Sequence, residues 1–407
     1  MRMLTLKNQV VIGTQTIVND KDTRTSFASG DLPSVQRLLE QQRSFWPSNK
    51  RITDVIVPKE ADPFRTVTLK RQVTARLEAL NQQLRAPVDA EVRLVDGNEL
   101  VTRSVNGTQY DIPKLLKAYD AHAYDSVIRL DVSLEQPVRE NSTLIRKEKA
   151  LLHQFLQRSV SYVLQGKPYS FAAAELVKNA VLSKTMAITV EDAGVTAKMN
   201  ELNNTLSTLH KNYTFRNNAG QVIAVQGQSY GWAIDVPAET KRVVDALIKG
   251  EPTVKAYNIY GIGYSTYGVG YRNPDNNGIG TTYAEVSISQ QRVWLYKNGQ
   301  MVLTTNVVTG KHSTGEDTPT GVWYVEYKQS PSVLKGSEVG KADYQVNVNY
   351  WAPFTLSGCG FHDAPWRSNW APDAYLTQGS GGCINTPPAV MPQVYNLLVQ
   401  NEPVVIY

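Results

Sequence analysis

The sequence predicts a multidomain α+β protein, in which two α+β repeat modules precede a mainly-β domain with one helix. The chain has 407 residues, which is too long for a single ordinary core. A motif recurs at a domain-sized spacing in the first two thirds, and the last third alternates apolar and polar residues as β-strands do. We expect domains at 1–140, 141–256 and 281–407, with a Gly/Tyr-rich linker at 257–280.

The repeat is visible in two helical segments and in the hairpins that follow them. Residues 73–84 read VTARLEALNQQL and residues 195–206 read VTAKMNELNNTL. The offset between the copies is 122 residues at the helix and 123 at the turn glycines, Gly97 and Gly220. Each copy predicts an amphipathic helix, a hairpin with a glycine turn and a second helix that begins at a proline. Because neither copy carries a catalytic motif, we expect binding or spacing modules.

Composition restricts the possible functions. Hydrophobic residues make up 42% of the chain and charged residues 19%, which is typical of a folded globular protein. The net charge of +5 comes without a dense Lys/Arg run, so it fits an anionic cell wall or membrane surface as well as nucleic acid. Two cysteines cannot build a disulfide framework or a cysteine-rich metal site.

The N-terminal region gives no membrane signal. No apolar run approaches the roughly 18 residues of a membrane span, and the stretch MRMLTLKNQVVIG lacks the apolar core of a signal peptide. We therefore expect either a cytoplasmic protein or the outer part of a longer product whose anchor is absent from this chain.

The last third reads as a small β domain. The stretch AEVSISQQRVWLYKNGQMVLTTNVVTG alternates apolar and polar residues, with Asn298-Gly299 predicting a hairpin turn. A helix is expected near 388–400, and the chain ends on a strand, PVVIY.

One of the two cysteines, Cys383, lies in the glycine-rich stretch GSGGCINTPP. Thr386 and the prolines after it predict a helix N-terminus close to Cys383, where the helix dipole would lower the thiol pKa. Backbone N–H groups of Gly381, Gly382 and Cys383 could converge on an oxyanion. These features favour a cysteine nucleophile, although a buried cysteine in a tight turn would give the same stretch.

A cysteine nucleophile needs a base. The candidate is His362, 21 residues before Cys383 on a predicted strand in CGFHDAPW. Because Cys–His pairs have no fixed spacing, the sequence also fits an unrelated strand histidine.

These residues carry a resemblance to the L,D-transpeptidase catalytic domain, a β-sandwich that cross-links peptidoglycan. The signature of that family is a His, a spacer, and then Ser/Thr-His-Gly-Cys, a hydrophobic residue and Asn. This chain has His362, seventeen intervening residues and then Ser380-Gly381-Gly382-Cys383-Ile384-Asn385. TGEDTPTGVW, YWAPF, FHDAPW and CINTPP are similar to the Gram-positive branch. The duplicated module resembles, more weakly, the peptidoglycan-binding domains that precede the catalytic domain in that branch.

The resemblance implies a role for each motif residue. Cys383 would be the nucleophile and His362 the general base, with the backbone carbonyl of Asp363 holding the imidazole tautomer. The N–H groups of Gly381, Gly382 and Cys383 would hold the oxyanion. Ser380 and Asn385 would brace the loop. Trp366 and Tyr350 would line a substrate groove.

The implied reaction is a two-step acyl transfer between peptidoglycan stem peptides. A tetrapeptide donor would acylate the cysteine, release D-Ala and form a 3→3 cross-link with an acceptor amine. Carbapenem β-lactams would acylate the same thiol. The resemblance implies no metal or organic cofactor, no nucleic-acid partner, and a location in the cell wall or on the extracellular face of the envelope. Membrane attachment would come only through an anchor outside this chain.

One position departs from the signature, because Gly381 stands where the family usually has His. Two alternatives therefore stay open: an L,D-carboxypeptidase, in which water replaces the acceptor amine, and a peptidoglycan-binding protein whose catalysis has lapsed. The second cysteine, Cys359, precedes His362 by three residues and is expected to be a packed core thiol. A disulfide between Cys359 and Cys383 would block the chemistry.

Overall fold

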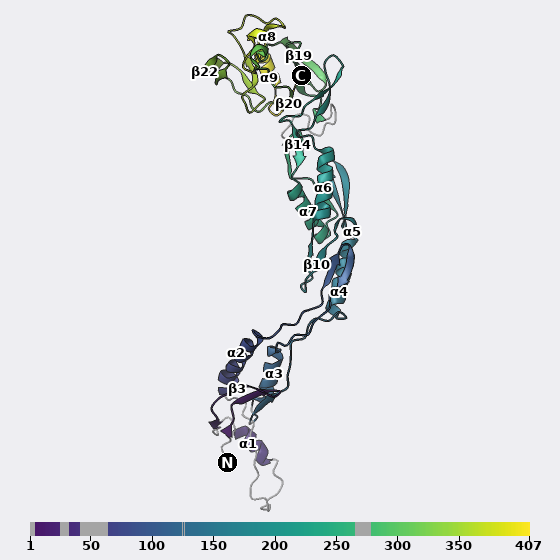
Figure 1. The fold of residues 1–407 in the computed structure, drawn as a ribbon, viewed down its shortest axis with the longest axis vertical. Helices are drawn as coiled ribbons and strands as arrows, with labels where there is room; N and C mark the ends of the chain where they lie inside the picture. The colour runs from purple at the N-terminus through teal and green to yellow at the C-terminus, as the bar shows by residue number, and fades with distance from the viewer. Residues whose placement is uncertain (1–4, 25–31, 41–63, 124, 126, 265–277) are drawn as a thin grey trace, which may run out of the picture. The chain divides into compact units, whose positions relative to one another are not determined.

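The computed structural model describes residues 5–24, 32–40, 64–123, 125, 127–264 and 278–407 (Figure 1). The chain forms two compact units. Unit 1 comprises Met1–Leu152 and Asn179–Thr189, and unit 2 comprises His153–Lys178 and Val190–Tyr407. Within the described residues, no helix is long and apolar enough to cross a membrane.

Unit 1 contains two larger sheets and several helices. One sheet has the order β3-β2-β7 and the other β11-β10-β5-β6, while β1 and β4 form a separate pair. The elements of this part of the chain are β1 (Thr5–Leu6), β2 (Gln9–Ile12), β3 (Gln15–Asn19), β4 (Thr23–Arg24), α1 (Leu32–Glu40), the π-helical η2 (Phe64–Leu69), α2 (Lys70–Asn81), β5 (Val92–Val95), β6 (Asn98–Val101), α3 (Ile112–His122), β7 (Ile128–Leu130), α4 (Thr143–Leu156), β10 (Ala180–Leu182) and β11 (Ile188–Val190).

The first part of unit 2 repeats this plan. Its three-stranded sheet has the order β15-β8-β9. Its elements are β8 (Ser159–Leu164), β9 (Lys167–Ala172), α5 (Ala173–Leu176), α6 (Ala193–Leu206), β12 (Tyr213–Arg216), β13 (Val222–Val225), β14 (Gly231–Ile234), α7 (Val236–Lys249), β15 (Thr253–Lys255) and β16 (Ile259–Ile262).

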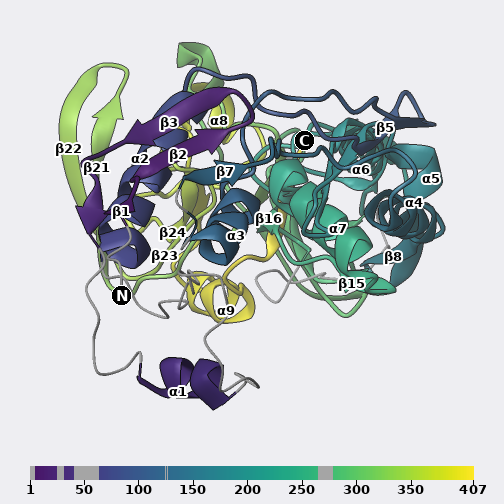
Figure 2. The ribbon, with the colours of Figure 1, turned by 90° about the horizontal axis from the view of Figure 1, so that it is seen from below.

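The internal repeat is present in the structure. In each copy an antiparallel hairpin (β2–β3 or β8–β9) gains a parallel third strand (β7 or β15), as Figure 2 shows for β2, β3 and β7. The second helix of each copy starts with a proline in its first turn and an aspartate cap: Asp111 accepts from Lys114 N–H at 3.0 Å and Asp235 from Ala238 N–H at 3.1 Å. The two copies therefore share both topology and capping.

Each copy also has a second hairpin, and its glycine turn adopts a conformation that other residues rarely take. Gly97 and Gly220 both have φ of +79°. The hairpin β5–β6 of the first copy pairs with β10. The hairpin β12–β13 of the second copy instead packs against the C-terminal domain, where Phe215 shares a buried cluster with Val322 and Val405.

The C-terminal domain is built on two facing sheets. The larger has the order β19-β18-β17-β26-β20, the smaller β23-β24-β25, and β21–β22 is a separate hairpin. The elements are β17 (Tyr283–Ser287), β18 (Arg292–Lys297), β19 (Gln300–Asn306), the 3-10 helix η4 (His312–Thr314), β20 (Gly321–Tyr324), β21 (Ser332–Glu338), β22 (Lys341–Val348), β23 (Trp351–Pro353), β24 (Gly360–Asp363), α8 (Ala374–Gln378), β25 (Ile384–Thr386), α9 (Met391–Leu397) and β26 (Pro403–Ile406).

A single core joins the two sheets, as a mainly-β sandwich requires. Val286 and Leu295 of the larger sheet share it with Phe361 and Ile384 of the smaller sheet, and Val394 of α9 covers one side. The predicted Asn298-Gly299 turn joins β18 to β19, with φ of +51° and +79° at its two residues.

Several boundaries differ from the sequence-based expectation. Residues 141–152 and 179–189 of the expected second module lie in unit 1. The expected linker contains a strand, because β16 pairs with β14, while residues 265–277 lie outside the described part of the chain. The C-terminal domain also has a short helix, α8, in addition to the expected one.

A buried carboxylate fastens the β12–β13 hairpin to the C-terminal domain. Glu285 Oε1 on β17 accepts from Asn218 N–H (2.8 Å), Asn218 Nδ2 (3.0 Å) and the Tyr407 hydroxyl (2.6 Å). Glu285 is fully buried, so the donors to Oε1 replace part of its lost hydration, whereas Oε2 has no hydrogen-bond partner among the described residues. Burial and the Glu285 carboxylate raise the pKa of Tyr407, which keeps its hydroxyl protonated as a donor.

We expect Tyr407→Phe to lower the free energy of unfolding of unit 2 by about 2 kcal/mol, because the Glu285 carboxylate loses a buried donor. Hydrogen exchange of β17 and β26 in the full chain measures this loss as faster exchange. Tyr395→Phe is the control, since Tyr395 contacts Tyr350 and Lys328 through its ring. Equal exchange in the wild type and Tyr407→Phe would contradict the prediction.

Candidate active site

The sheet β23-β24-β25 brings the predicted nucleophile and base to one face. β24 pairs in parallel with β25 so that His362 lies opposite Asn385. Cys383 is two residues before Asn385, and side chains two apart along an extended chain share a face. On the other side of β24, Trp351 pairs with His362 and also packs with Cys383. The sheet therefore gathers these four side chains on one surface.

The Cys383 thiol contacts the backbone of Gly358 and Gly360, the two neighbours of Cys359. Its Sγ donates to the Gly358 carbonyl at 3.5 Å, and the Gly360 N–H lies within hydrogen-bonding reach. The residue is only 8% exposed. Burial, reinforced by the neighbouring Cys359 sulfur, raises the pKa of the Cys383 thiol to about 12 despite the Gly360 N–H. At neutral pH the free protein therefore holds a neutral thiol.

This state corrects the expectation that a helix dipole lowers the thiol pKa. The residues after Cys383 form β25, which pairs in parallel with β24, so Thr386 is a strand residue and not a helix cap. The helix α9 starts at Met391, eight residues after Cys383. The dipole acts within about one turn of a helix end, so the nucleophile lies outside its reach.

His362 is buried and fixed in one tautomer. Its Nδ1 lies 2.9 Å from the carbonyl oxygen of Asp363. A carbonyl can only accept, so Nδ1 carries the proton and Nε2 is left as the basic nitrogen. Burial lowers the pKa of His362, against the raising effect of the Asp363 carbonyl, so the ring is neutral at pH 7. The Asp363 carbonyl thus has the geometry expected of it.

Two indole rings enclose the imidazole. Trp366 stacks on His362 with ring centroids 5.7 Å apart and an interplanar angle of 30°, while Trp351 lies at 6.0 Å on a tilted plane. Trp366 remains 52% exposed. Its exposed side lies beside His362, and a role in a substrate groove stays a prediction.

Asn385 and Arg367 hold the basic nitrogen. With the Asn385 amide oriented to satisfy its neighbours, Nδ2 donates to His362 Nε2 at 3.0 Å. The amide oxygen accepts from Arg367 Nη2 at 2.9 Å and Nε at 3.1 Å. Among the described residues no hydrogen bond joins Cys383 to His362, and His362 Nε2 is instead bonded to the Asn385 amide. Apo sites often show such long catalytic pairs.

Ser380 braces the nucleophile loop. Its hydroxyl donates to the Cys383 carbonyl at 2.6 Å and accepts from the Gly382 N–H at 3.2 Å. From the other side, Thr318 Oγ1 donates to the Gly382 carbonyl at 2.8 Å. The Gly382 N–H is therefore already bound, and it would have to leave Ser380 to hold an oxyanion.

Glycine is required at position 382 but not at 381. Gly382 has φ of +115°, and a Cβ there would lie 2.8 Å from the Cys359 sulfur. The three atoms nearest to a Cβ at Gly381 all belong to the flexible side chain of Glu338, with its Cγ at 2.8 Å. Glu338 comes from the β21–β22 hairpin, drawn in light green in Figure 2. The place that a side chain at 381 would take is thus occupied by a carboxylate from this hairpin.

The structure corrects the expected position of Tyr350. Neighbouring residues of an extended segment point to opposite faces, and Trp351 faces the thiol and imidazole. Tyr350 consequently turns toward the core, where its ring contacts Tyr395 with centroids 5.1 Å apart. Trp351 takes the place beside the site that the sequence analysis gave to Tyr350.

Cys359 is a packed thiol, as expected. It is partly buried against the core of the C-terminal domain, and both cysteines are free. Burial raises the pKa of the Cys359 thiol, so it too is neutral at pH 7.

Three residues of the site escaped the sequence analysis. Trp351 could have been found from strand alternation, since it and Tyr350 cannot both face the groove. Arg367 and Glu338 reach the site through long-range contacts that leave no local sequence signal.

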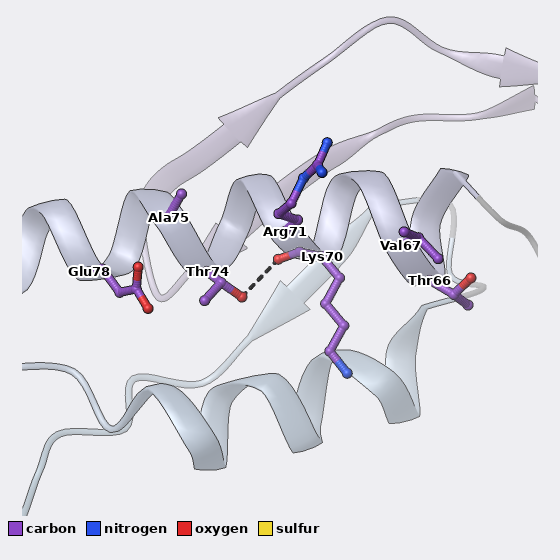
Figure 3. Close-up of a pocket in the computed structure, with 7 residues that line it drawn as sticks. All are labelled: Thr66, Val67, Lys70, Arg71, Thr74, Ala75 and Glu78. Atoms are coloured by element: carbon purple, nitrogen blue, oxygen red, sulfur yellow. Dashed lines mark hydrogen bonds between the residues drawn. The ribbon is translucent and has the colours of Figure 1, made fainter.

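Other parts of the structure offer weaker candidates. Figure 3 shows a surface depression along η2 and α2, where Thr74 Oγ1 donates to the Lys70 carbonyl at 2.9 Å. Its lining contains no cysteine or histidine and consists of Thr66, Val67, Lys70, Arg71, Thr74, Ala75 and Glu78. Over the described ranges, no group of three or more His, Cys, Asp or Glu could hold a metal ion.

Two family models match parts of the chain. Residues 281–406 match the family described as L,D-transpeptidase catalytic domain. Residues 151–255 match the family described as "Putative peptidoglycan binding domain". No curated protein matches the chain.

Several solved structures are similar to the chain. The avibactam carbamoyl enzyme of Ldtfm is 26% identical with a TM-score of 0.52, and the match covers 65% of this chain and 98% of that one. The C442S mutant of the Enterococcus faecium L,D-transpeptidase has the same identity and TM-score, over 64% of this chain and 100% of that one. The catalytic domain from the E. faecium L,D-transpeptidase is 40% identical over 31% of this chain and 96% of that one, with a TM-score of 0.29.

These matches assign residues 281–406 to the L,D-transpeptidase catalytic domain family and residues 151–255 to the family described as "Putative peptidoglycan binding domain".

Proposed function

We propose that the protein is an active L,D-transpeptidase that forms 3→3 peptidoglycan cross-links through a thioester on Cys383. The observation that carries the proposal is the shared face of β24 and β25, which sets a tautomer-fixed imidazole beside a cysteine. The peptidoglycan-binding domain supports peptidoglycan as the substrate. It also supports a location in the cell wall, on the extracellular face of the envelope.

The first step is acylation. The tetrapeptide stem displaces Asn385 from His362, and Nε2 takes the thiol proton as Cys383 attacks the carbonyl of the third stem residue. The C–S bond forms, the oxyanion is held by backbone N–H groups of residues 381–383, and the C–N bond to D-Ala breaks. His362 returns its proton to the departing amine.

The second step is transfer to an acceptor. An amine of a neighbouring stem attacks the thioester carbonyl and gives a proton to His362. The new C–N bond forms, the C–S bond breaks, and the Cys383 sulfur recovers the proton. These steps use side chains and backbone of this chain together with the two stems.

One specific observation favours a different reading, a peptidoglycan-binding protein whose catalysis has lapsed. In the free structure the thiol is neutral and His362 Nε2 is bonded to Asn385. A site that never exchanges these partners would bind stems without reacting. The acylation experiment separates the two functions.

We expect the wild type to gain one carbapenem adduct by intact-mass spectrometry, and Cys383→Ala to gain none. Cys359→Ala, the matched control for loss of a thiol, should keep the adduct. His362→Ala should be slower by roughly 100-fold, because the general base is lost. A folded, reduced wild type that forms no adduct favours the lapsed protein.

Product analysis separates the two possible activities of an acylated enzyme. With purified tetrapeptide muropeptides, a transpeptidase yields cross-linked dimers, whereas an L,D-carboxypeptidase yields tripeptide monomers alone.

The pH dependence of acylation tests His362 as the base. The reactive form requires a neutral imidazole and a protonated thiol, so the rate should fall as pH drops through the lowered pKa of His362, below its ordinary value of 6.5. The rate should then stay level to at least about pH 9, because the thiol pKa lies near 12. In His362→Ala it should instead rise about tenfold per pH unit, following the thiolate fraction. The same profile in both proteins would exclude His362 as the base.

Arg367 is expected to act as a positioning residue through Asn385. Its charge also lowers the pKa of His362, so Arg367→Gln should move the acid limb of the rate profile to higher pH. The acylation rate should fall by roughly 10- to 100-fold, as for a displaced catalytic group. Arg367→Lys is the control, since it keeps the charge and loses the two-pronged contact. If Arg367→Gln is acylated more slowly but the acid limb of its rate profile does not move, Arg367 has only a structural role.

A further inference from the structure

Glu338 is the acidic side chain that lies against the nucleophile loop. A Cβ built on Gly381 would be 2.8 Å from its Cγ and 3.4 Å from its Oε1, so only the absence of a side chain at 381 admits it. Gly381 is two residues before Cys383. The half-buried carboxylate is also close enough to the thiol for its charge to raise the pKa of Cys383.

The hairpin that carries Glu338 is fixed to the same framework as the nucleophile. Next to Glu338, the Val339 N–H donates to Glu316 Oε1 at 2.6 Å. The other oxygen of Glu316 accepts from Thr314 Oγ1 at 2.5 Å and pairs with Lys311 Nζ at 3.5 Å. Lys311 in turn donates its N–H to the Ser380 carbonyl at 2.8 Å. This chain of contacts sets Glu338 relative to the loop.

Local backbone geometry supports the same placement. The pairing of β21 with β22 shifts register between Gly336 and Glu338. A bulge of this kind redirects the side chain that follows it and is frequent beside active sites. The irregularity therefore lies where the hairpin reaches Gly381.

A carboxylate at this place opposes the first step of the reaction. Like charge disfavours both the Cys383 thiolate and the oxyanion that forms on the donor carbonyl. Arg367 offsets part of this charge, since Glu338 and the guanidinium attract each other. The second step differs, because its incoming reactant is an amine that carries a positive charge in neutral water.

We propose that Glu338 is the acceptor-side specificity residue, whose carboxylate binds the primary ammonium group of the acceptor stem and places it at the thioester. The inference rests on the proposed transpeptidase function. The bound ammonium releases one proton to solvent, and the free amine then attacks the thioester carbonyl. As the C–N bond forms and the C–S bond breaks, the second proton passes to His362 and then to the Cys383 sulfur.

The test compares Glu338→Gln with Asp343→Asn, an exposed carboxylate on the same hairpin. The full chain is acylated by a tetrapeptide donor, and Nα-acetyl-lysine amide is titrated as the acceptor amine. Glu338→Gln should raise the KM for this amine by roughly tenfold, as expected for loss of one partly exposed charge partner, and shift products toward hydrolysis. Its acylation should be faster, because the charge that opposes the thiolate and the oxyanion is removed. Asp343→Asn should match the wild type in each measurement.

The contact itself is tested by a pair of alanines. Gly381→Ala should slow acylation because its Cβ would clash with Glu338 Cγ and shift the nucleophile loop. Glu338→Ala removes that Cγ and should restore the rate in the double variant while leaving the amine KM high. If Glu338→Gln is acylated and its KM for the amine is unchanged, the inference about Glu338 is wrong, but the proposed function stands. A wild type that is never acylated would overturn the proposed function, and this inference with it.

Discussion

The parallel pairing of β24 with β25 is the constraint on which the candidate site depends. It sets His362 opposite Asn385 and leaves Cys383 on the same face. A slip of one residue would turn every side chain of β25 to the other face and remove the thiol from the imidazole. Buried contacts hold this register, because Phe361 and Ile384 belong to the core between the two sheets. Packing inside the sandwich and chemistry on its surface are thus fixed by the same strands.

The duplicated modules show how one sequence pattern can serve two contexts. Both copies bury equivalent helix residues, Val73 and Leu77 in α2 and Val195 and Met199 in α6. Their second hairpins have different partners: β5–β6 pairs with β10, whereas β12–β13 packs on the catalytic domain. Repetition therefore specifies the fold of each copy, and residues outside the repeat specify what its hairpin contacts.

Sequence reasoning succeeded where the determining contacts are local. Asn298-Gly299 forms the expected turn, since its positive φ angles suit those two residues. The helix near 388–400 exists, but its start was placed too early, because Thr386 pairs with Asp363 in the sheet and does not cap a helix. The predicted lowering of the Cys383 pKa was also wrong, because no helix begins next to the thiol. Burial by neighbouring segments raises this pKa, and no short motif around Cys383 encodes that burial.

The neutral, buried thiol also affects how fast the protein would be damaged by oxidation or alkylation of Cys383. Oxidants and alkylating agents attack thiolates far faster than thiols, and the first oxidation product is a sulfenic acid. A sulfur with a pKa near 12, only 8% exposed, presents almost no thiolate to such reagents. In oxidising surroundings, a Cys383 sulfur that stays protonated until a substrate brings His362 to it, as the proposed mechanism requires, would resist this damage.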